Sequence, residues 1–535
     1  MNFRRCMVAA CLVLSSLIVL ADDDDHHHDA SEGLGAVSFP TSCAPTVQKS
    51  FERGVALLHS FEYEQAEKQF REVSAGDPQC AMAYWGEAVS LYHQLWQRPA
   101  KDVVKHGHEL VEKGLALNPK TARERDYLTA LAAFYGDAEK MNHVQRAEAY
   151  AKAMEGVYQR NPKDREAAVF YALSLLASGP EDDPTLANAK KAVAILEKGF
   201  DEQPDHPGIA HYIIHSCDNP AMASLGLAAA RKYASIAPSS PHAVHMPSHI
   251  FARLGLWQDD IQSNAAALQA ADKMAAMQFH TMHHRMHSLD FMHYAYMQVG
   301  DDEQARAIAD TLAHISRKDI EEDYQNYYDE RSAEFTARYA TERRQWKEAV
   351  ALQPISSALP HVQATTYWAR AVGAGHLQDA EAAQAALQKY DALVEETRKG
   401  PKANLASRMK NGRDEAQAWT FFAQGKNDEA LKLMRLVADR QDKVGKGETE
   451  MPAREMLADM LLTIGRPQDS LKEYEVALHT DPNRFNGLYG AAQAAEQAQQ
   501  KQKAAGYYAQ LIKNCQGAQS DRPELEKART LVAAK

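Results

Sequence analysis

Several short motifs of enzyme chemistry are missing from this sequence. It contains no glycine-rich phosphate loop, no G-x-S-x-G elbow, no H-E-x-x-H and no paired C-x-x-C. A basic surplus is missing too, because 60 Lys and Arg residues face 72 Asp and Glu residues, for a formal net charge of -12. Nucleic acids and anionic membranes select basic surfaces, so we expect neither as a partner. Small ligands, cations and proteins remain as possible partners.

Long apolar runs are also lacking, except at the N-terminus. There, Arg4 and Arg5 precede an apolar run over residues 6–20, which is shorter than the about 20 residues of a membrane span. With Ala21 at its end, this order predicts a signal peptide over residues 1–21, with a retained anchor as the alternative. Its removal predicts a periplasmic or secreted protein with no membrane span.

The next stretch, residues 22–43, begins DDDDHHHD and continues with Ser, Gly and Pro. It shows no apolar period. Polar, low-complexity stretches of this kind cannot bury enough apolar surface to fold. We therefore expect a disordered Asp/His-rich linker here.

From Val47 onward the pattern is typical of helical hairpins. In the first unit, Gly54, Ala66, Phe70 and Pro78 follow one another at offsets of 12, 4 and 8 residues. Small residues let two helices approach, the aromatic ring fills the space between them, and proline ends the second helix.

This pattern resembles the tetratricopeptide repeat (TPR) family, whose unit is 34 residues long. The resemblance implies an all-α fold, a tetratricopeptide-like α-solenoid of about twelve helical hairpins over residues 44–535. The family mostly builds concave grooves that hold peptides or partner proteins, so the resemblance implies a scaffold before any chemistry.

Cysteine is scarce, and four cysteines remain once residues 1–21 are removed. Cys43 precedes the first expected helix and Cys80 begins the helix one repeat later. Because export brings both into an oxidising compartment, we predict that they form a disulfide. For Cys217 a soft metal ligand, a bridge partner and a buried thiol all stay open, with the buried thiol favoured.

Histidine is the residue in excess. Eleven of the 23 histidines lie between His206 and His293. His211 and His215 are four residues apart, and an identically spaced pair, His245 and His249, follows 34 residues later. In the TPR family, certain positions of each hairpin's first helix line the concave groove. The resemblance implies that the two histidine pairs and His242 occupy such positions, so that all five lie on one concave wall. Pro247 is expected to kink this helix or delay its start.

Imidazoles gathered on one wall predict a metal centre. Calcium and magnesium prefer oxygen ligands, whereas imidazole suits copper, zinc, iron or nickel. Methionines lie between the histidine clusters, which favours copper, with zinc or iron as alternatives; methionine packing in a core is the competing interpretation. Two or more ions would explain the number of histidines better than one. The predicted ligands are His211, His215, His242, His245, His249, His280, His283, His284 and His287.

Three functional hypotheses follow. The first is an exported TPR-like protein with a polyhistidine metal centre, a copper-dependent oxidoreductase or a metal-assisted hydrolase that acts on a small molecule or peptide in the groove. In it Asp290 and Tyr294 are the candidate catalytic residues that move protons. The second is a periplasmic protein that binds or delivers metal without turnover. The third is a protein-binding scaffold without metal, whose histidines only pack.

Overall fold

The computed structural model describes residues 33–95, 98–180, 183–277, 279–315, 317–320 and 322–533. The predicted signal peptide, residues 1–21, and the linker as far as residue 32 lie outside these ranges. Within them, all regular structure is helical: there are 26 α-helices and three short 3-10 helices, and no strand. The all-α prediction is confirmed.

The helices follow one another with short connections. The first third of the chain contains α1 (Gln48–His59), α2 (Tyr63–Gly76), α3 (Ala81–Ser90), α4 (Lys101–Ala116), α5 (Ala122–Tyr135), α6 (His143–Arg160), α7 (Arg165–Ser178) and α8 (Ala187–Phe200). The middle contains α9 (Pro207–Cys217), α10 (Ala223–Ile236), α11 (Pro241–His245), α12 (Pro247–Arg253), α13 (Trp257–Ala276), α14 (Met282–Gln298), α15 (Asp302–His314), α16 (Glu322–Glu342) and α17 (Trp346–Ala351). The last third contains α18 (Pro360–His376), α19 (Ala380–Lys399), α20 (Lys410–Ala423), α21 (Asn427–Val444), α22 (Ala453–Thr463), α23 (Pro467–Thr480), α24 (Phe485–Gln497), α25 (Lys501–Asn514) and α26 (Pro523–Ala533). The 3-10 helices are η1 (Pro45–Val47), η2 (Arg317–Asp319) and η3 (Ala403–Leu405).

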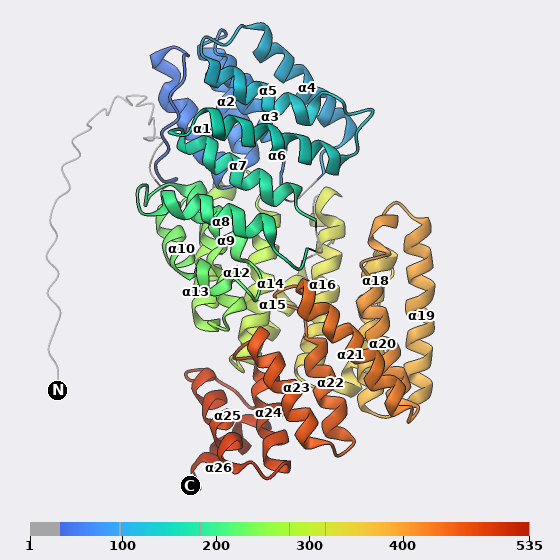
Figure 1. Cartoon of the computed structure of the whole chain (residues 1–535). Coiled ribbons are helices and arrows are strands. Elements are labelled where there is room, and N and C mark those ends of the chain that lie inside the picture. The colour runs from blue at the N-terminus through green and yellow to red at the C-terminus, as the bar shows by residue number, and fades with distance from the viewer. Residues whose placement is uncertain are drawn as a thin grey trace, which may run out of the picture.

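Neighbouring helices pack in pairs, and the pairs stack into a TPR-like solenoid (Figure 1). The small residues and the aromatic ring of the repeat pattern explain the close approach. A Cβ atom added to Gly86 in α3 would lie 2.2 Å from the Phe70 ring of α2, and one added to Gly54 in α1 would lie 2.8 Å from it. Glycine at both positions therefore lets one ring fill the space between three helices.

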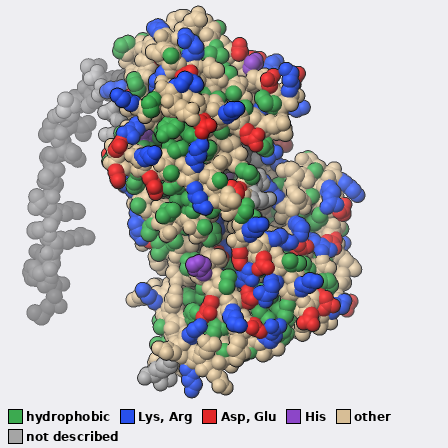
Figure 2. Space-filling view, in the orientation of Figure 1, with side chains coloured by type: hydrophobic (Ala, Val, Ile, Leu, Met, Phe, Trp, Pro, Cys, Tyr) green, Lys and Arg blue, Asp and Glu red, His purple; other side chains and the backbone are tan. Residues whose placement is uncertain are grey.

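The solenoid turns back on itself. Helix α1 contacts α9, and α14 contacts α24, although these helices are far apart in sequence (Figure 1). His211, His242, His245 and His249 of the central repeats are buried. On the face shown in Figure 2, acidic and basic side chains are interspersed and few histidines reach the surface.

The packed part of the chain begins before the predicted boundary at residue 44. Phe39 is fully buried, Ala36 donates a backbone hydrogen bond of 2.9 Å to Asp205, and Ser42 donates one of 2.6 Å to Glu124. Residues 33–43 therefore lie against the repeats, because their few apolar side chains find partners that the sequence alone does not reveal.

The predicted disulfide between Cys43 and Cys80 is confirmed. Cys217 is a buried free thiol, as the favoured interpretation held, and Cys515 is buried as well. Among the described residues, no helix has both the length and the apolar character required to cross a membrane.

Candidate metal centre

Four helices supply the central histidines. Helix α9 carries His211 and His215, and α14 carries His283, His284 and His287. The expected interruption at Pro247 is present: the chain forms two short helices that meet at Met246, with His242 and His245 on α11 and His249 on α12. Proline begins α9, α11 and α12, where its missing N–H costs no helical hydrogen bond.

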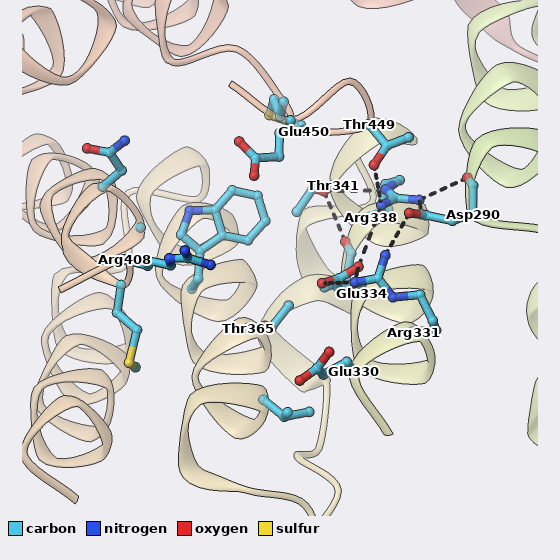
Figure 3. A pocket seen from close by; sticks show the side chains of 18 of the residues that line it. Asp290, Glu330, Arg331, Glu334, Arg338, Thr341, Thr365, Arg408, Thr449 and Glu450 are labelled. Carbon is cyan, nitrogen blue, oxygen red and sulfur yellow. Dashed lines mark hydrogen bonds and ion pairs between the residues drawn. The ribbon is translucent and has the colours of Figure 1, made fainter. Parts of the chain in front are cut away.

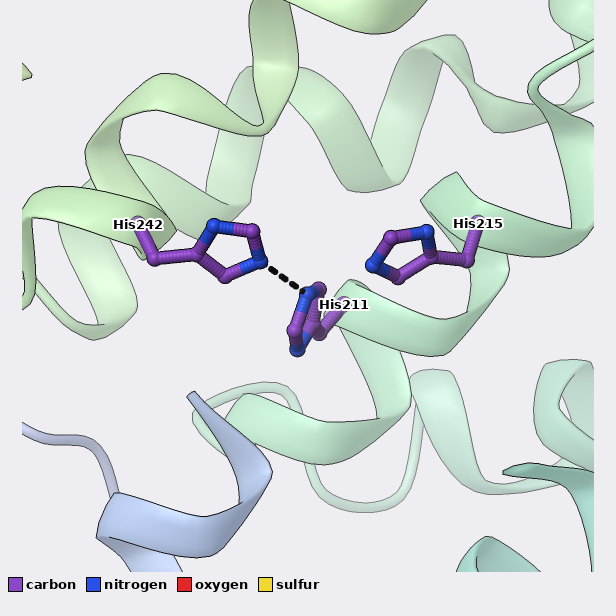
Figure 4. Close-up of side chains that lie close together, drawn as sticks. All are labelled: His211, His215 and His242. Carbon is purple, nitrogen blue, oxygen red and sulfur yellow. Dashed lines mark hydrogen bonds between the residues drawn. The ribbon is translucent and has the colours of Figure 1, made fainter. Parts of the chain in front are cut away.

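His211, His215 and His242 form a first triad, hereafter triad A (Figure 4). Each offers a ring nitrogen, and these three atoms lie within 4.8 Å of one another. The Nε2 atoms of His211 and His242 are 3.0 Å apart. The Nε2 atom of His215 is buried and has no hydrogen-bonding partner among the described residues. A buried nitrogen without a partner is costly unless something binds it.

His245, His249 and His287 form a second triad, triad B, with the same spacing limit of 4.8 Å between ring nitrogens. Here the Nε2 atoms of His245 and His249 are 3.1 Å apart. The triads adjoin each other: the ring centroids of His242 and His245 are 6.4 Å apart, and those of His215 and His249 are 6.5 Å apart. Two three-histidine sites therefore lie side by side.

The outer nitrogens of these rings are held by hydrogen-bond acceptors. His211 Nδ1 lies 2.5 Å from the backbone oxygen of His59, and His249 Nδ1 lies 2.9 Å from Asp218 Oδ2. His245 Nδ1 lies 2.5 Å from Asn264 Oδ1, and the Asn264 amide donates to the backbone oxygen of Asp260 at 3.0 Å, which fixes its orientation. Such partners keep the proton on Nδ1 and turn the Nε2 lone pair inward, the arrangement usual around metal-binding histidines.

In triad B this arrangement has an electrostatic consequence. When both rings are neutral, two lone pairs face each other between His245 and His249, which is repulsive unless a cation lies between them. Two nitrogens that bind one ion at about 2.05 Å in tetrahedral geometry are about 3.3 Å apart, close to the spacing found. A proton on His249 is the alternative to a metal ion between these two nitrogens.

The protonation of the cluster is set by burial. Burial lowers the pKa of His211 to about 3 and those of His283 and His284 to about 4. It also lowers the pKa values of the other triad histidines well below their usual value, with the exception of His249; these are His215, His242, His245 and His287. These rings are therefore neutral near pH 7, which is the form that binds metals.

His249 is the exception. Burial lowers its pKa, but Asp218 and Glu448 outweigh burial and raise the pKa to about 10. Arg253 pairs with the same two carboxylates, at 3.0 Å from Asp218 and 3.3 Å from Glu448. The edge of triad B is thus supported by a charged network.

The remaining predicted ligands lie around the triads or away from them. The His283 ring stacks on His287 with centroids 5.9 Å apart, and the His284 ring lies 6.4 Å from His242. His280 is exposed and lies beside the Tyr324 ring, outside both triads. Of the nine predicted ligands, six form the triads, two flank them and one is peripheral. The sequence placed them on an open groove wall, whereas the fold buries four of them and half-buries four more. His59 at the end of α1 and Glu448 between α21 and α22 lie against that wall.

Asp290 and Tyr294, the predicted catalytic residues, both form hydrogen bonds with arginines. Asp290 accepts hydrogen bonds from Arg338 at 2.6 Å and Arg331 at 2.7 Å; burial raises its pKa, but these cations outweigh burial and lower it. Tyr294 is buried against Arg484, and burial raises its pKa. A carboxylate held by two cations is a weak proton acceptor, so the geometry gives no added support to the proton-transfer prediction.

A third group, His59, Glu166 and His206, was missed at the sequence level. Glu166 bridges the two rings, at 2.8 Å from His59 Nε2 and 2.9 Å from His206 Nε2. The other ring nitrogens are also satisfied, since His59 Nδ1 lies 3.0 Å from the Tyr212 hydroxyl and His206 Nδ1 accepts from the backbone N–H of Ile209. With every polar atom paired, this buried group is structural. No local signal could have found it, because Glu166 is 107 residues from His59.

A cavity of about 660 Å³ adjoins triad B. His287 and Glu448 line it together with side chains of α14, α16, α18 and α20, and Figure 3 shows part of this lining. Glu448 lies on the connection between α21 and α22, which also reaches Arg338 through the Thr449 hydroxyl at 3.1 Å. Glu448 also contacts His249 Nδ1, at 3.2 Å. The sequence gave no indication of the contact between these two residues, because they are 199 residues apart.

Comparisons with known proteins bear on the scaffold alone. The model of the tetratricopeptide repeat family matches residues 415–483 and 455–519. The chain is therefore similar to this family over residues 415–519. A comparison with curated proteins found no match.

Among solved structures, a human IFIT1 dimer with m7Gppp-AAAA is similar at 12% identity, covering 81% of this chain and 90% of that chain, with a TM-score of 0.33. The TPR domain of P58(IPK) is similar at 15% identity, covering 91% of this chain and 99% of that chain, with a TM-score of 0.20. The APC/C hetero-tetramer Cut9-Hcn1 is similar at 10% identity, covering 90% of each chain, with a TM-score of 0.32. At such values these likenesses support no conclusion about ligands.

Proposed function

We propose that this chain is an exported TPR-type protein that holds two transition-metal ions, one in each histidine triad. The observation that carries the proposal is the convergence of three imidazoles in each triad, with a His215 Nε2 atom in triad A that has no partner among the described residues and with facing Nε2 atoms in triad B. Three nitrogen ligands leave a fourth position for a ligand at each ion, as catalytic zinc and copper sites do.

The choice of metal rests on compartment and ligand type. Copper is the first choice, with zinc or iron next. The Cys43–Cys80 disulfide supports export, because such bonds persist in oxidising compartments. The interleaved methionines lend less support than their positions in sequence suggested, since Met222 and Met246 pack in one apolar cluster, and Met286 and Met292 in another.

The cavity beside His287 favours chemistry on a bound small molecule over metal storage. A copper ion would supply one-electron redox chemistry, and zinc would polarise a bound group. The protein's part is to hold the ions with fixed imidazoles and to admit a ligand from one side. Metal delivery without turnover is the second candidate, favoured by the burial of most of the triad histidines.

Elemental analysis of the untagged, full-length protein tests the proposal. We expect two equivalents of bound metal per chain, and about one in each of His211→Ala and His249→Ala. His280→Ala is the matched control, because His280 lies outside both triads. Replacement of His26, His27 and His28 by serine controls for metal collected by the N-terminal histidines.

The scaffold hypothesis makes the opposite prediction. If the native protein carries no stoichiometric metal and binds none when titrated with copper(II) or zinc(II), the triads are packing histidines. Equal metal loss in His280→Ala and His211→Ala would also contradict the assignment.

A further inference from the structure

The cavity beside triad B is divided into two chemically different halves. In the half near His287, the arginines and acids are already matched. Arg331 and Arg338 both bind Asp290, and Arg331 also binds Glu334 at 2.9 Å (Figure 3). Because these charges offset one another, this half has little preference for a charged ligand.

The other half is rich in carboxyl groups and aromatic rings. Glu330 on α16 and Glu450 on the connection between α21 and α22 reach the cavity from separate elements (Figure 3). Glu330 has an imidazole partner, His361, at 3.1 Å, and its side chain keeps 31% of its exposure. Arg408 is exposed at this side of the cavity. Over the whole lining, seven residues carry carboxyl groups and three carry guanidinium groups.

Two aromatic side chains belong to the lining of the same cavity. The Trp368 indole N–H donates to Glu415 at 2.7 Å, which fixes the ring, and the Tyr390 hydroxyl donates to the backbone oxygen of Met409 at 3.1 Å. Both residues line the cavity. Aromatic faces flanked by carboxylates attract organic cations through cation–π and ionic contacts together.

We infer that this cavity binds a ligand carrying an alkylammonium group, with the cation between Glu330, Glu450 and the Trp368 ring. The volume suits a small organic amine or a short peptide with a lysine side chain. The rest of such a ligand extends toward His287. That this ligand is the substrate rests on the proposed function, whereas its binding does not require the metal.

Isothermal titration of the full-length protein with matched probes tests the inference. N-acetyl-lysine methylamide is compared with its uncharged norleucine analogue and with the glutamate analogue; butylammonium separates a free amine from a lysyl group. We expect saturable binding of the lysine probe and of butylammonium, at affinities on the order of 1 mM or better, and no binding of the other two.

Variants locate the site. Glu330→Gln and Glu450→Gln should each weaken binding of the lysine probe about fivefold, as expected for one partly exposed ion pair. Trp368→Leu should weaken it as well, and Glu396→Gln, an exposed acid outside the cavity, should not. Equal binding of the lysine and norleucine probes, preference for the glutamate probe, or no saturable binding would overturn the inference.

Metal analysis of the same samples separates the two proposals. Amine binding by a protein that takes up no metal would overturn the metal centre and leave the ammonium site standing. Stoichiometric metal without amine binding would do the reverse.

Discussion

The partner that holds His245 offers a specific test of the metal centre. Asn264 is fully buried, and its Oδ1 atom lies 2.5 Å from His245 Nδ1. In Asn264→Ala this acceptor is lost, so the His245 ring can rotate or move its proton to Nε2, which must be free of a proton to bind metal. Loss of such a supporting hydrogen bond typically weakens metal binding about 10- to 100-fold, or about 1.4–2.7 kcal/mol. The effect should be confined to triad B, because triad A has its own support in the His59 backbone oxygen.

The assay is a zinc(II) titration against a competing chelator, in which the two sites appear as separate steps. Asn486→Ala is the matched control. Asn486 is also buried, and its amide donates a hydrogen bond of 2.9 Å to the backbone oxygen of Glu342, but it supports none of the triad histidines. Both variants should lose stability, and only Asn264→Ala should lose metal affinity at one site. Unchanged affinity, or an equal loss in the control, would refute the role given to His245.

Three further predictions concern the scaffold. Replacing Cys43 and Cys80 by serine should destabilise the first repeats by about 4 kcal/mol, because the bridge closes a loop with a separation of 37 residues, and thermal unfolding with and without reductant measures this. Burial raises the pKa of Glu415 to about 8, against a hydrogen bond from Trp368 that lowers it, so the folded state keeps a proton that the unfolded chain releases. The free energy of unfolding should therefore fall as the pH rises from about 4.5 to about 8, and Glu415→Gln should flatten this slope in urea titrations; an unchanged slope would contradict it. Gly86→Ala should destabilise the protein by about 1–3 kcal/mol through its clash with the Phe70 ring, whereas Gly506→Ala, with nothing within 4 Å, should stabilise it by about 0.5–1 kcal/mol.

The sequence predicted the scaffold well where a signal is local and repeated. The spacing of Gly54, Ala66 and Phe70 identified the hairpin unit, and Pro247 correctly marked a break between His245 and His249. The repeat register also placed five of the six triad histidines, all but His287, on one wall. These features are readable because a helix has a fixed period, so residue spacing alone determines which side chains share a face.

The limits of the sequence lay in contacts between distant segments. It could not show that Glu448 reaches His249, that Glu166 joins His59 to His206, or that residues 33–43 pack against the repeats. It also predicted His280 as a ligand, although this residue precedes α14 and lies outside both triads. The spacing of residues along a helix does not tell which of its turns meets a neighbouring helix.

Composition and periodicity thus determined an all-α repeat scaffold with imidazoles collected on one inner surface. The tertiary structure decided that most of this surface is buried, that the histidines divide into two triads, and that a cavity with carboxylates and aromatic rings opens beside one of them. The physical reason is that a local period fixes the direction of a side chain on its own helix, while burial and partners depend on how distant helices pack over it.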